Sequence, residues 1–193
     1  MTKLALLGAI AAPLLLATPA HAATFFVSQS GNGVSANGTI TTDDTVGSLA
    51  EGNITDFQLD LDDGTGVFTL NGFANAGISI SGSGLTATAT GLFFDFSGSG
   101  FALFQNPGPG SGINFLCFAG NSVCGGDTNR TSISVDNFGG GFAQEGVQQV
   151  GFLEVGSAVP EPSTWAMLLL GFFFAGGALR AAGRKQTATL SYS

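Results

Sequence analysis

Apolar and polar residues alternate along most of the chain between residues 23 and 158. In ITDFQLDLDDG (54–64), apolar side chains occupy every second position from Phe57 to Leu61, with polar ones between them. The segments GISISGSG (77–84) and SISVDNF (132–138) repeat this alternation. A period of two is typical of a strand with one face on a core and one in water. No sustained helical period occurs in this region, so the pattern predicts an all-β domain.

Turn-forming residues divide this region into short runs. Glycine, asparagine, aspartate and proline clusters recur at intervals of about 8–12 residues, which favours an antiparallel sandwich or barrel. The runs between them predict eleven strands: Thr24–Gln29, Ser35–Thr42, Ile54–Asp62, Val67–Asn71, Ile78–Ser81, Leu85–Thr90, Leu92–Phe96, Phe101–Phe104, Ile113–Phe118, Ser132–Asp136 and Val147–Val155.

Phenylalanine supplies the expected core. Fifteen of the eighteen phenylalanines precede the C-terminal apolar run, and each buries about 150–250 Å² when enclosed. GLFFDFSGSGFALF (91–104) predicts a central hairpin with Phe94 and Phe96 on one face. An exposed aromatic ligand platform is the alternative to a core, but large exposed aromatic patches are exceptional on monomeric domains.

The N-terminus has the three parts of a secretory signal peptide. Lys3 gives a short basic region, Leu4–Leu16 is apolar, and Ala20-His21-Ala22 is a small-x-small cleavage signal. This pattern predicts a signal peptide over 1–22 with cleavage after Ala22, the alternative being an uncleaved N-terminal anchor. The β-domain then covers 23–158.

The C-terminus combines prolines, an apolar run and basic residues. Val159-Pro160-Glu161-Pro162 precedes sixteen uncharged residues, 164–179, and Arg180, Arg184 and Lys185 follow. Trp165 stands at the outer edge of the run, where interfacial aromatics belong, and the basic residues predict a cytoplasmic end. We therefore expect one transmembrane helix over 164–182, followed by a short cytoplasmic tail at 186–193. A plain single-span anchor and a lipid-anchor signal are the alternatives, although the latter tails end apolar.

Charge and composition exclude several function classes. Between Ala23 and Ala158 the chain has twelve carboxylates and one arginine, a net charge of −11, and it has no Lys, His, Trp, Tyr or Met. Nucleic-acid binding requires a basic footprint that this region lacks. Serine- or cysteine-histidine catalysis and zinc binding lack their histidines. No cofactor is expected, and only carboxylate-pair hydrolysis stays open as an enzymatic chemistry.

Cys117 and Cys124 are the only cysteines. Behind a signal peptide, an even cysteine count predicts a disulfide rather than a metal site.

One acidic segment, DLDDGTG (60–66), resembles the opening of a calcium loop. Asp60, Asp62 and Asp63 are closely spaced, but the twelfth position, where a chelating Glu belongs, is Asn71. The segment is better interpreted as an Asp-Gly turn between a strand ending near Asp62 and one starting near Val67. A weak candidate calcium site at these three aspartates remains the alternative.

The C-terminal segment resembles a known sorting signal. Val159-Pro160-Glu161-Pro162 with Trp165-Ala166, a short apolar span and a terminal basic cluster looks like the PEP-CTERM signal of Gram-negative bacteria, and the resemblance covers residues 159–185. It implies recognition by an exosortase, cleavage near the motif, export through the inner membrane, and transfer to the cell surface or matrix, often beside exopolysaccharide. The tail at 186–193 departs from the family, whose members usually end sooner.

Three functions follow from these observations. The first is an exported surface or biofilm-matrix protein without catalytic activity. The second is a calcium- or carbohydrate-binding surface module, disfavoured by the lack of Trp and Tyr in the domain. The third is a carboxylate-based glycosidase, which needs two carboxylates about 5–9.5 Å apart in a cleft.

Overall fold

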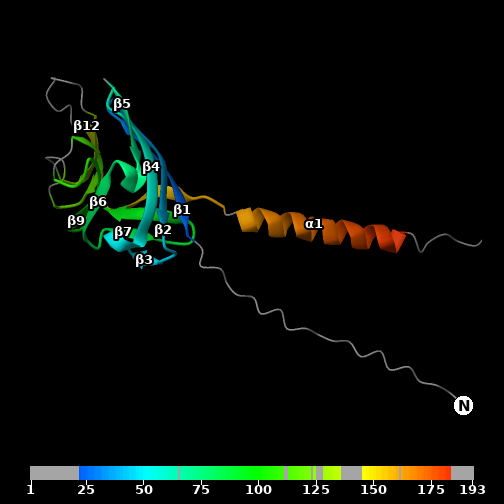
Figure 1. Cartoon of the computed structure of the whole chain (residues 1–193). Helices are drawn as coiled ribbons and strands as arrows, with labels where there is room; N and C mark the ends of the chain where they lie inside the picture. Colours follow the sequence, from blue (N-terminus) through cyan, green and yellow to red (C-terminus); the bar gives the residue numbers. More distant parts are fainter. Residues whose placement is uncertain are drawn as a thin grey trace, which may run out of the picture.

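A computed structural model describes residues 22–64, 66–110, 113–122, 124, 128–135, 145–160 and 162–183. The fold is an all-β domain followed by one helix, α1 (Pro162–Gly183) (Figure 1). All strand pairs are antiparallel.

The strands form two sheets. The larger sheet has eight strands in the spatial order β3 (Gly47–Ser48), β7 (Leu85–Ala87), β8 (Gly91–Asp95), β13 (Phe152–Ala158), β1 (Thr24–Gly31), β2 (Val34–Thr42), β4 (Ile54–Asp62) and β5 (Val67–Asn71). The smaller sheet has five, in the order β12 (Glu145–Gln148), β11 (Arg130–Ser134), β10 (Asn114–Ala119), β9 (Gly100–Asn106) and β6 (Gly77–Gly82). Two short 3-10 helices, η1 (Glu51–Asn53) and η2 (Gly72–Ala74), lie between strands.

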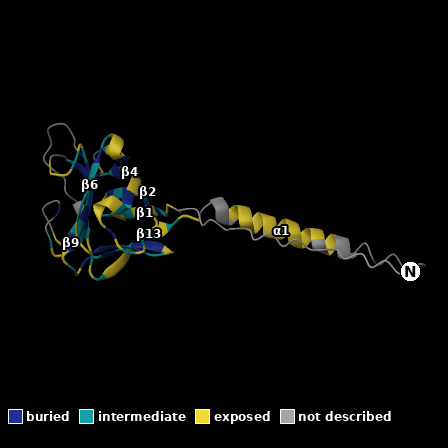
Figure 2. Ribbon diagram, turned by 60° about the horizontal axis from the view of Figure 1, so that its bottom comes forward, coloured by how far each residue is buried: buried dark blue, intermediate teal, exposed yellow. Residues whose placement is uncertain are grey.

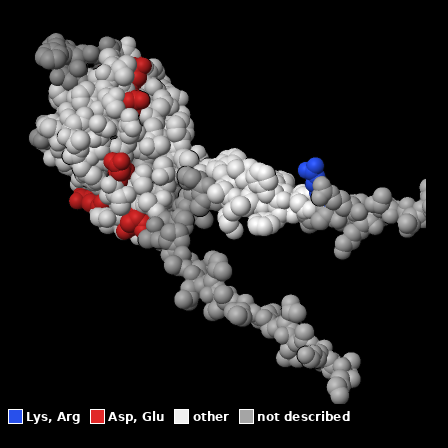
Figure 3. All heavy atoms as spheres, turned by 45° about the vertical axis from the view of Figure 1, so that its right-hand side comes forward, with Lys and Arg blue, Asp and Glu red and all other residues white. Residues whose placement is uncertain are grey.

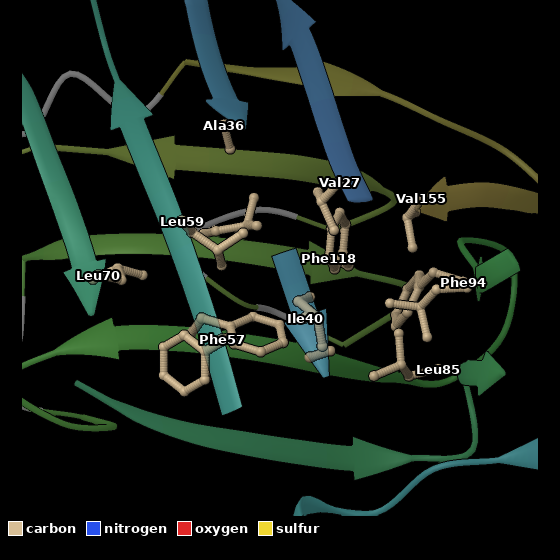
Figure 4. Packing of buried hydrophobic residues seen from close by; sticks show 14 of the residues in the cluster. Val27, Ala36, Ile40, Phe57, Leu59, Leu70, Leu85, Phe94, Phe118 and Val155 are labelled. Atoms are coloured by element: carbon tan, nitrogen blue, oxygen red, sulfur yellow. The ribbon is translucent and has the colours of Figure 1, made fainter. Parts of the chain in front are cut away.

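The core lies between the two sheets, so the domain is a sandwich rather than a barrel. Phe57 and Leu59 of the larger sheet and Phe104 and Phe118 of the smaller one are at most 1% exposed and belong to one apolar cluster. The rings of Phe57 and Phe104 meet edge to face across the sheets, with centroids 5.2 Å apart. Figure 4 shows Phe57, Leu59 and Phe118 among the side chains between the strand layers.

The period-two pattern places side chains correctly in the larger sheet. In β4, Phe57, Leu59 and Leu61 are buried, whereas Gln58 and Asp60 are exposed. Phe94 and Phe96 share the core side as expected, with centroids 4.9 Å apart. The alternation of apolar and polar residues therefore predicts which side chains of β4 face the core.

Two strands of the smaller sheet, β10 and β11, are enclosed on both faces, which the alternation did not predict. All six residues of β10 are buried, and so are Thr131, Ser132 and Ser134 of β11. On the face away from the core, Cys117 packs in a second cluster with Cys124 and the partly buried Phe101 and Leu103. This cluster covers the face that the sequence pattern assigned to water.

The expected hairpin at 91–104 does not form. β8 pairs with β7 and β13 in the larger sheet, whereas β9 pairs with β10 and β6 in the smaller one. Phe96, between them, is fully buried and packs on Phe94 and Phe118. Burial of this ring turns the chain from one sheet into the other.

The prediction of a single strand at 147–155 is also wrong. It divides into β12 in the smaller sheet and β13 in the larger one. Gly151, between them, has φ +82°, a left-handed conformation that breaks a strand and that glycine adopts without strain. The short β3 was not predicted, whereas β4 and β5 have the expected bounds.

Candidate functional site

The residues expected to form the sorting motif begin where the sandwich ends. The last strand, β13, ends at Ala158, and the Val159 N–H donates to the Thr24 carbonyl at 2.8 Å. Pro160 has no N–H to continue this pairing, and α1 begins at Pro162. Proline is well suited to the first turn of a helix, where its missing N–H has no partner in any case. The junction between strand and helix is therefore very short; Glu161 lies outside the described residues.

The N-terminal end of the domain lies beside this junction. β1 starts next to the end of β13, with Phe25 paired with Ala158. The Ala23 carbonyl accepts a hydrogen bond of 2.8 Å from the Thr42 N–H, and Ala22 is exposed. The expected cleavage position after Ala22 and the motif residues Val159 and Pro160 thus share one end of the sandwich (Figure 1). Ala20 and the rest of the expected signal lie outside the described residues.

A hollow of about 530 Å³ opens at the same end. Ala23, Val46, Thr88, Thr90 and Pro160 are among its lining residues, and Asp44 is the one carboxylate. The side chains that line this hollow are thus mostly small and uncharged.

A hydrogen-bonded loop forms one wall of this hollow. The Asn53 amide donates to Asp43 at 3.1 Å, and the Thr45 N–H donates to the other oxygen of that carboxylate at 3.1 Å. Hydrogen bonding by the Asn53 side chain first, and then by the Thr45 side chain, holds the pKa of the Asp43 carboxyl below its ordinary value of 3.8. The loop is therefore ordered by its own side chains.

α1 exposes apolar side chains all around its axis (Figure 2). Trp165 is 59% exposed, and exposure is similar or greater for most of the other large apolar residues of α1: Met167, Leu168, Leu169, Leu170, Phe172, Phe173, Phe174 and Leu179. Ala166 and Arg180 are exposed as well. Nothing in the sandwich covers this helix.

The transmembrane assignment for 164–182 is not supported. A helix forms where it was expected, but within the described residues no helix combines the length and the apolarity needed to cross a membrane. Arg184, Lys185 and the tail at 186–193 lie outside the described residues.

Charge is distributed unevenly between the two parts of the molecule. Acidic side chains are scattered over the face of the sandwich seen in Figure 3, and the basic group visible there lies toward the far end of α1. Among the described residues, Arg130 on β11 is the one basic residue of the sandwich. The acidic surface expected from composition is therefore present.

The predicted disulfide is confirmed: Cys117 of β10 is bonded to Cys124. It holds the segment after β10 against the outer face of the smaller sheet. Both cysteines are buried, which suits a structural role.

The acidic segment 60–66 forms the predicted turn. β4 and β5 are paired up to Asp62 and Val67, and the Asp62 carboxylate accepts the Gly64 N–H at 2.8 Å. Asp63 is 5% exposed, and its carboxylate accepts the N–H groups of Gly66 at 3.0 Å and Val135 at 3.3 Å. Asp60 accepts the Thr69 hydroxyl at 2.6 Å. Within the described part of the chain, no three His, Cys, Asp or Glu residues gather closely enough to hold a metal ion.

A second hollow, of about 260 Å³, lies on the outer face of the larger sheet. Phe26, Ser28 and Glu154 are among its lining residues. Like the first hollow it contains one carboxylate, so neither presents the pair used in glycoside hydrolysis. Sequence reasoning missed this surface, although Phe25-Phe26 and Phe93-Phe94 signalled it: adjacent strand residues point to opposite faces.

Comparisons of this chain with protein-family models, with curated proteins and with solved structures found no match.

Proposed function

We propose that this chain is an exported bacterial surface or matrix protein without catalytic activity, delivered by C-terminal processing. In this proposal residues 159–185 act as a PEP-CTERM-type signal recognised by an exosortase. The observation that carries it is the contrast at Pro160: a self-contained sandwich ends there, and a helix with uncovered apolar side chains begins.

The first supporting argument concerns what processing would remove. A soluble helix normally buries one apolar stripe, whereas a helix that is apolar all around requires a lipid or protein environment. The sandwich core closes without α1, because none of the described core residues comes from the helix. Cleavage near the motif would therefore leave the sandwich intact.

The second argument concerns where processing would occur. Thr24 and Val159 are hydrogen-bonded neighbours, so both hydrophobic ends of the chain leave the sandwich at one side. This arrangement suits a domain that is held near a membrane by its two ends during export. The proposal requires α1 to associate with lipid before processing; it does not require α1 to cross the bilayer.

The third argument concerns the composition of the delivered part. An acidic sandwich with a buried disulfide suits an oxidising, extracellular location. Net negative charge favours solubility and repels other polyanions. The exopolysaccharide association in this proposal comes from the resemblance of the C-terminal motif to its family.

The test is mass spectrometry of the form found on the cell surface. We expect this form to begin at Ala23 and to lack Trp165–Ser193. The variant Glu161→Ala should retain the C-terminal segment and stay in the membrane fraction, since it removes the carboxylate between the two prolines. The matched control Glu154→Ala removes an exposed carboxylate seven residues earlier and should be processed normally. An intact C-terminus on the surface form would contradict the proposal.

A further inference from the structure

Aromatic rings lie on the outer face of the larger sheet, where water-facing residues were expected. Phe25 and Phe94 enter the core at 1% exposure, so their neighbours Phe26 and Phe93 must point outward. Phe26 is 46% exposed. Phe152 is 55% exposed and stacks on Phe93, with ring centroids 5.2 Å apart and planes 3° from parallel. We call the surface formed by Phe26, Phe93, Phe152 and Glu154 the aromatic face.

A carboxylate lies within this aromatic face. Glu154 is exposed, pairs with Phe93 across β13 and β8, and is two residues from Phe152, on the same side of its strand. The strand register shifts between Glu154 and Gly156, which marks a β-bulge. Bulges reorient side chains and are frequent beside binding sites.

The hollow of about 260 Å³ lies at this bulge. Its lining combines the Phe26 ring with the Glu154 carboxylate, the hydroxyls of Ser28 and Ser157, and Gln29. The Gln29 amide donates to the Val155 carbonyl at 3.1 Å, which leaves its oxygen as an acceptor. The site therefore offers acceptors and hydroxyls beside an aromatic ring.

Charge selects among ligands for this surface. The described basic residues are Arg130 on the smaller sheet and Arg180 in α1, so the aromatic face has Glu154 and no cation. An anionic ligand would meet a carboxylate without a compensating charge, which is unfavourable. A neutral ligand with hydroxyl donors matches the acceptors present.

The carboxylate among the rings argues against a protein partner. Stable protein interfaces bury about 800 Å² on each side, with an apolar centre. The aromatic face has three phenylalanine rings, and Glu154 interrupts them. Aromatic rings interspersed with polar groups fit a chain of sugars, whose rings alternate apolar C–H faces with hydroxyl edges.

We propose that the aromatic face binds a neutral polysaccharide. The Phe152 and Phe26 rings stack on the C–H faces of sugar units, because the face of an aromatic ring is electron-rich. The Glu154 carboxylate accepts hydrogen bonds from sugar hydroxyls. This proposal deepens the proposed function by naming a ligand class, and its biological sense rests on surface delivery. Glycan binding in solution does not depend on export, so the two proposals can fail separately.

The test is affinity electrophoresis of the full-length chain in a mild non-ionic detergent. The gels contain hydroxyethylcellulose, laminarin or dextran as neutral probes and alginate as the anionic probe. We expect at least one neutral probe to slow migration and alginate not to do so. Phe152→Ala should weaken that binding about tenfold, since the contact of one buried phenyl face is lost. Glu154→Gln should weaken it less, because the amide retains one acceptor.

The matched control is Phe73→Ala. Phe73 is 54% exposed, like Phe152, but it lies in η2 and packs edge-on against Phe57 instead of belonging to the aromatic face. Phe73→Ala should bind the neutral probe as the native chain does. Failure of all three neutral probes to slow migration would overturn the proposal. Equal weakening by Phe73→Ala and Phe152→Ala, or equal retardation by alginate, would overturn it too.

Discussion

The core of the sandwich and α1 are both rich in phenylalanine, but they place it in opposite environments. Phe57, Phe94 and Phe104 of the sandwich are at most 1% exposed, whereas Phe172 and Phe173 of α1 are 69% and 77% exposed. The spacing along the chain explains the difference. Alternate positions in a strand share one face, so one opposing sheet covers them all.

Consecutive positions in a helix cannot share a face. Phe172, Phe173 and Phe174 follow one another directly and therefore point in three directions about 100° apart. No single neighbouring element covers them. The spacing of the phenylalanines along the chain, and not the residue type, therefore determines whether these side chains are buried. If the sandwich folds independently of α1, changes in the sandwich should leave the helix intact, and changes in the helix should leave the stability of the sandwich unchanged.

The largest expected effect separates a core phenylalanine from one in the helix. Phe57 packs edge-on against Phe73 and Phe104, so Phe57→Ala leaves a cavity between the sheets. We expect the free energy of unfolding to fall by about 3–5 kcal/mol, as for other buried phenylalanines. Phe173→Ala, the control, should change it by less than about 0.5 kcal/mol. Urea unfolding followed by circular dichroism of the β-sheet measures both, and equal losses would refute the independence of the two regions.

The second effect concerns the disulfide on the outer face of the smaller sheet. Cys124 lies seven positions after Cys117, and the loop entropy of the unfolded chain predicts a loss of about 2–3 kcal/mol when the bond is absent. The double variant Cys117→Ala/Cys124→Ala should show this loss in urea unfolding. Reduction of the native chain should destabilise it similarly, and the helical dichroism of α1 should not change. A loss of helix on reduction would mean that the two regions are coupled.

The third effect concerns the buried carboxylate that joins the two sheets. Asp63 follows β4 of the larger sheet and accepts the N–H of Val135, which follows β11 of the smaller one. Asp63→Ala leaves buried N–H groups without this acceptor, and we expect a loss of about 1–3 kcal/mol. Asp60→Ala removes an exposed carboxylate nearby and should cost less than about 0.5 kcal/mol. Equal unfolding midpoints for the two variants would show that Asp63 does not connect the sheets.

The sequence predicted local structure better than long-range pairing. The bounds of β4 and β5, the turn at Asp62-Asp63-Gly64 and the disulfide were correct, because each depends on residues close together in the chain. The expected hairpin at 91–104 was wrong because strand partners are chosen by packing. β1 pairs with β13, at the other end of the domain, and no local pattern shows this.

The exposure of the outer sheet faces could not be predicted from the sequence either. Period two assigns a residue to a face, but it does not tell whether a loop covers that face. Ser132 and Ser134 are buried because the outer face of the smaller sheet is covered. Phe26 and Phe152 are exposed because the outer face of the larger sheet is not. Val159 was singled out from the sequence, whereas its hydrogen bond to Thr24 required the fold.

The smallest effect extends the comparison to the surface of the sandwich. Even the exposed ends of the segment 43–53 are held by internal hydrogen bonds, with Asn53 donating to Asp43. These bonds favour the ionised carboxylate, so the folded pKa of Asp43 lies below its unfolded value of 3.8. The resulting stability is present above the unfolded pKa and is lost as the pH falls through the folded one.

Asn53→Ala should raise the pKa of Asp43 toward its ordinary value, as measured by NMR titration of the carboxyl carbon. Thr55→Ala, which changes an exposed hydroxyl bonded to the Thr41 carbonyl, should leave the pKa of Asp43 unchanged. If the pKa of Asp43 were equal in the native chain and in Asn53→Ala, the Asn53 hydrogen bond would not be the cause of the lowered pKa, and solvation by water would set the charge of Asp43.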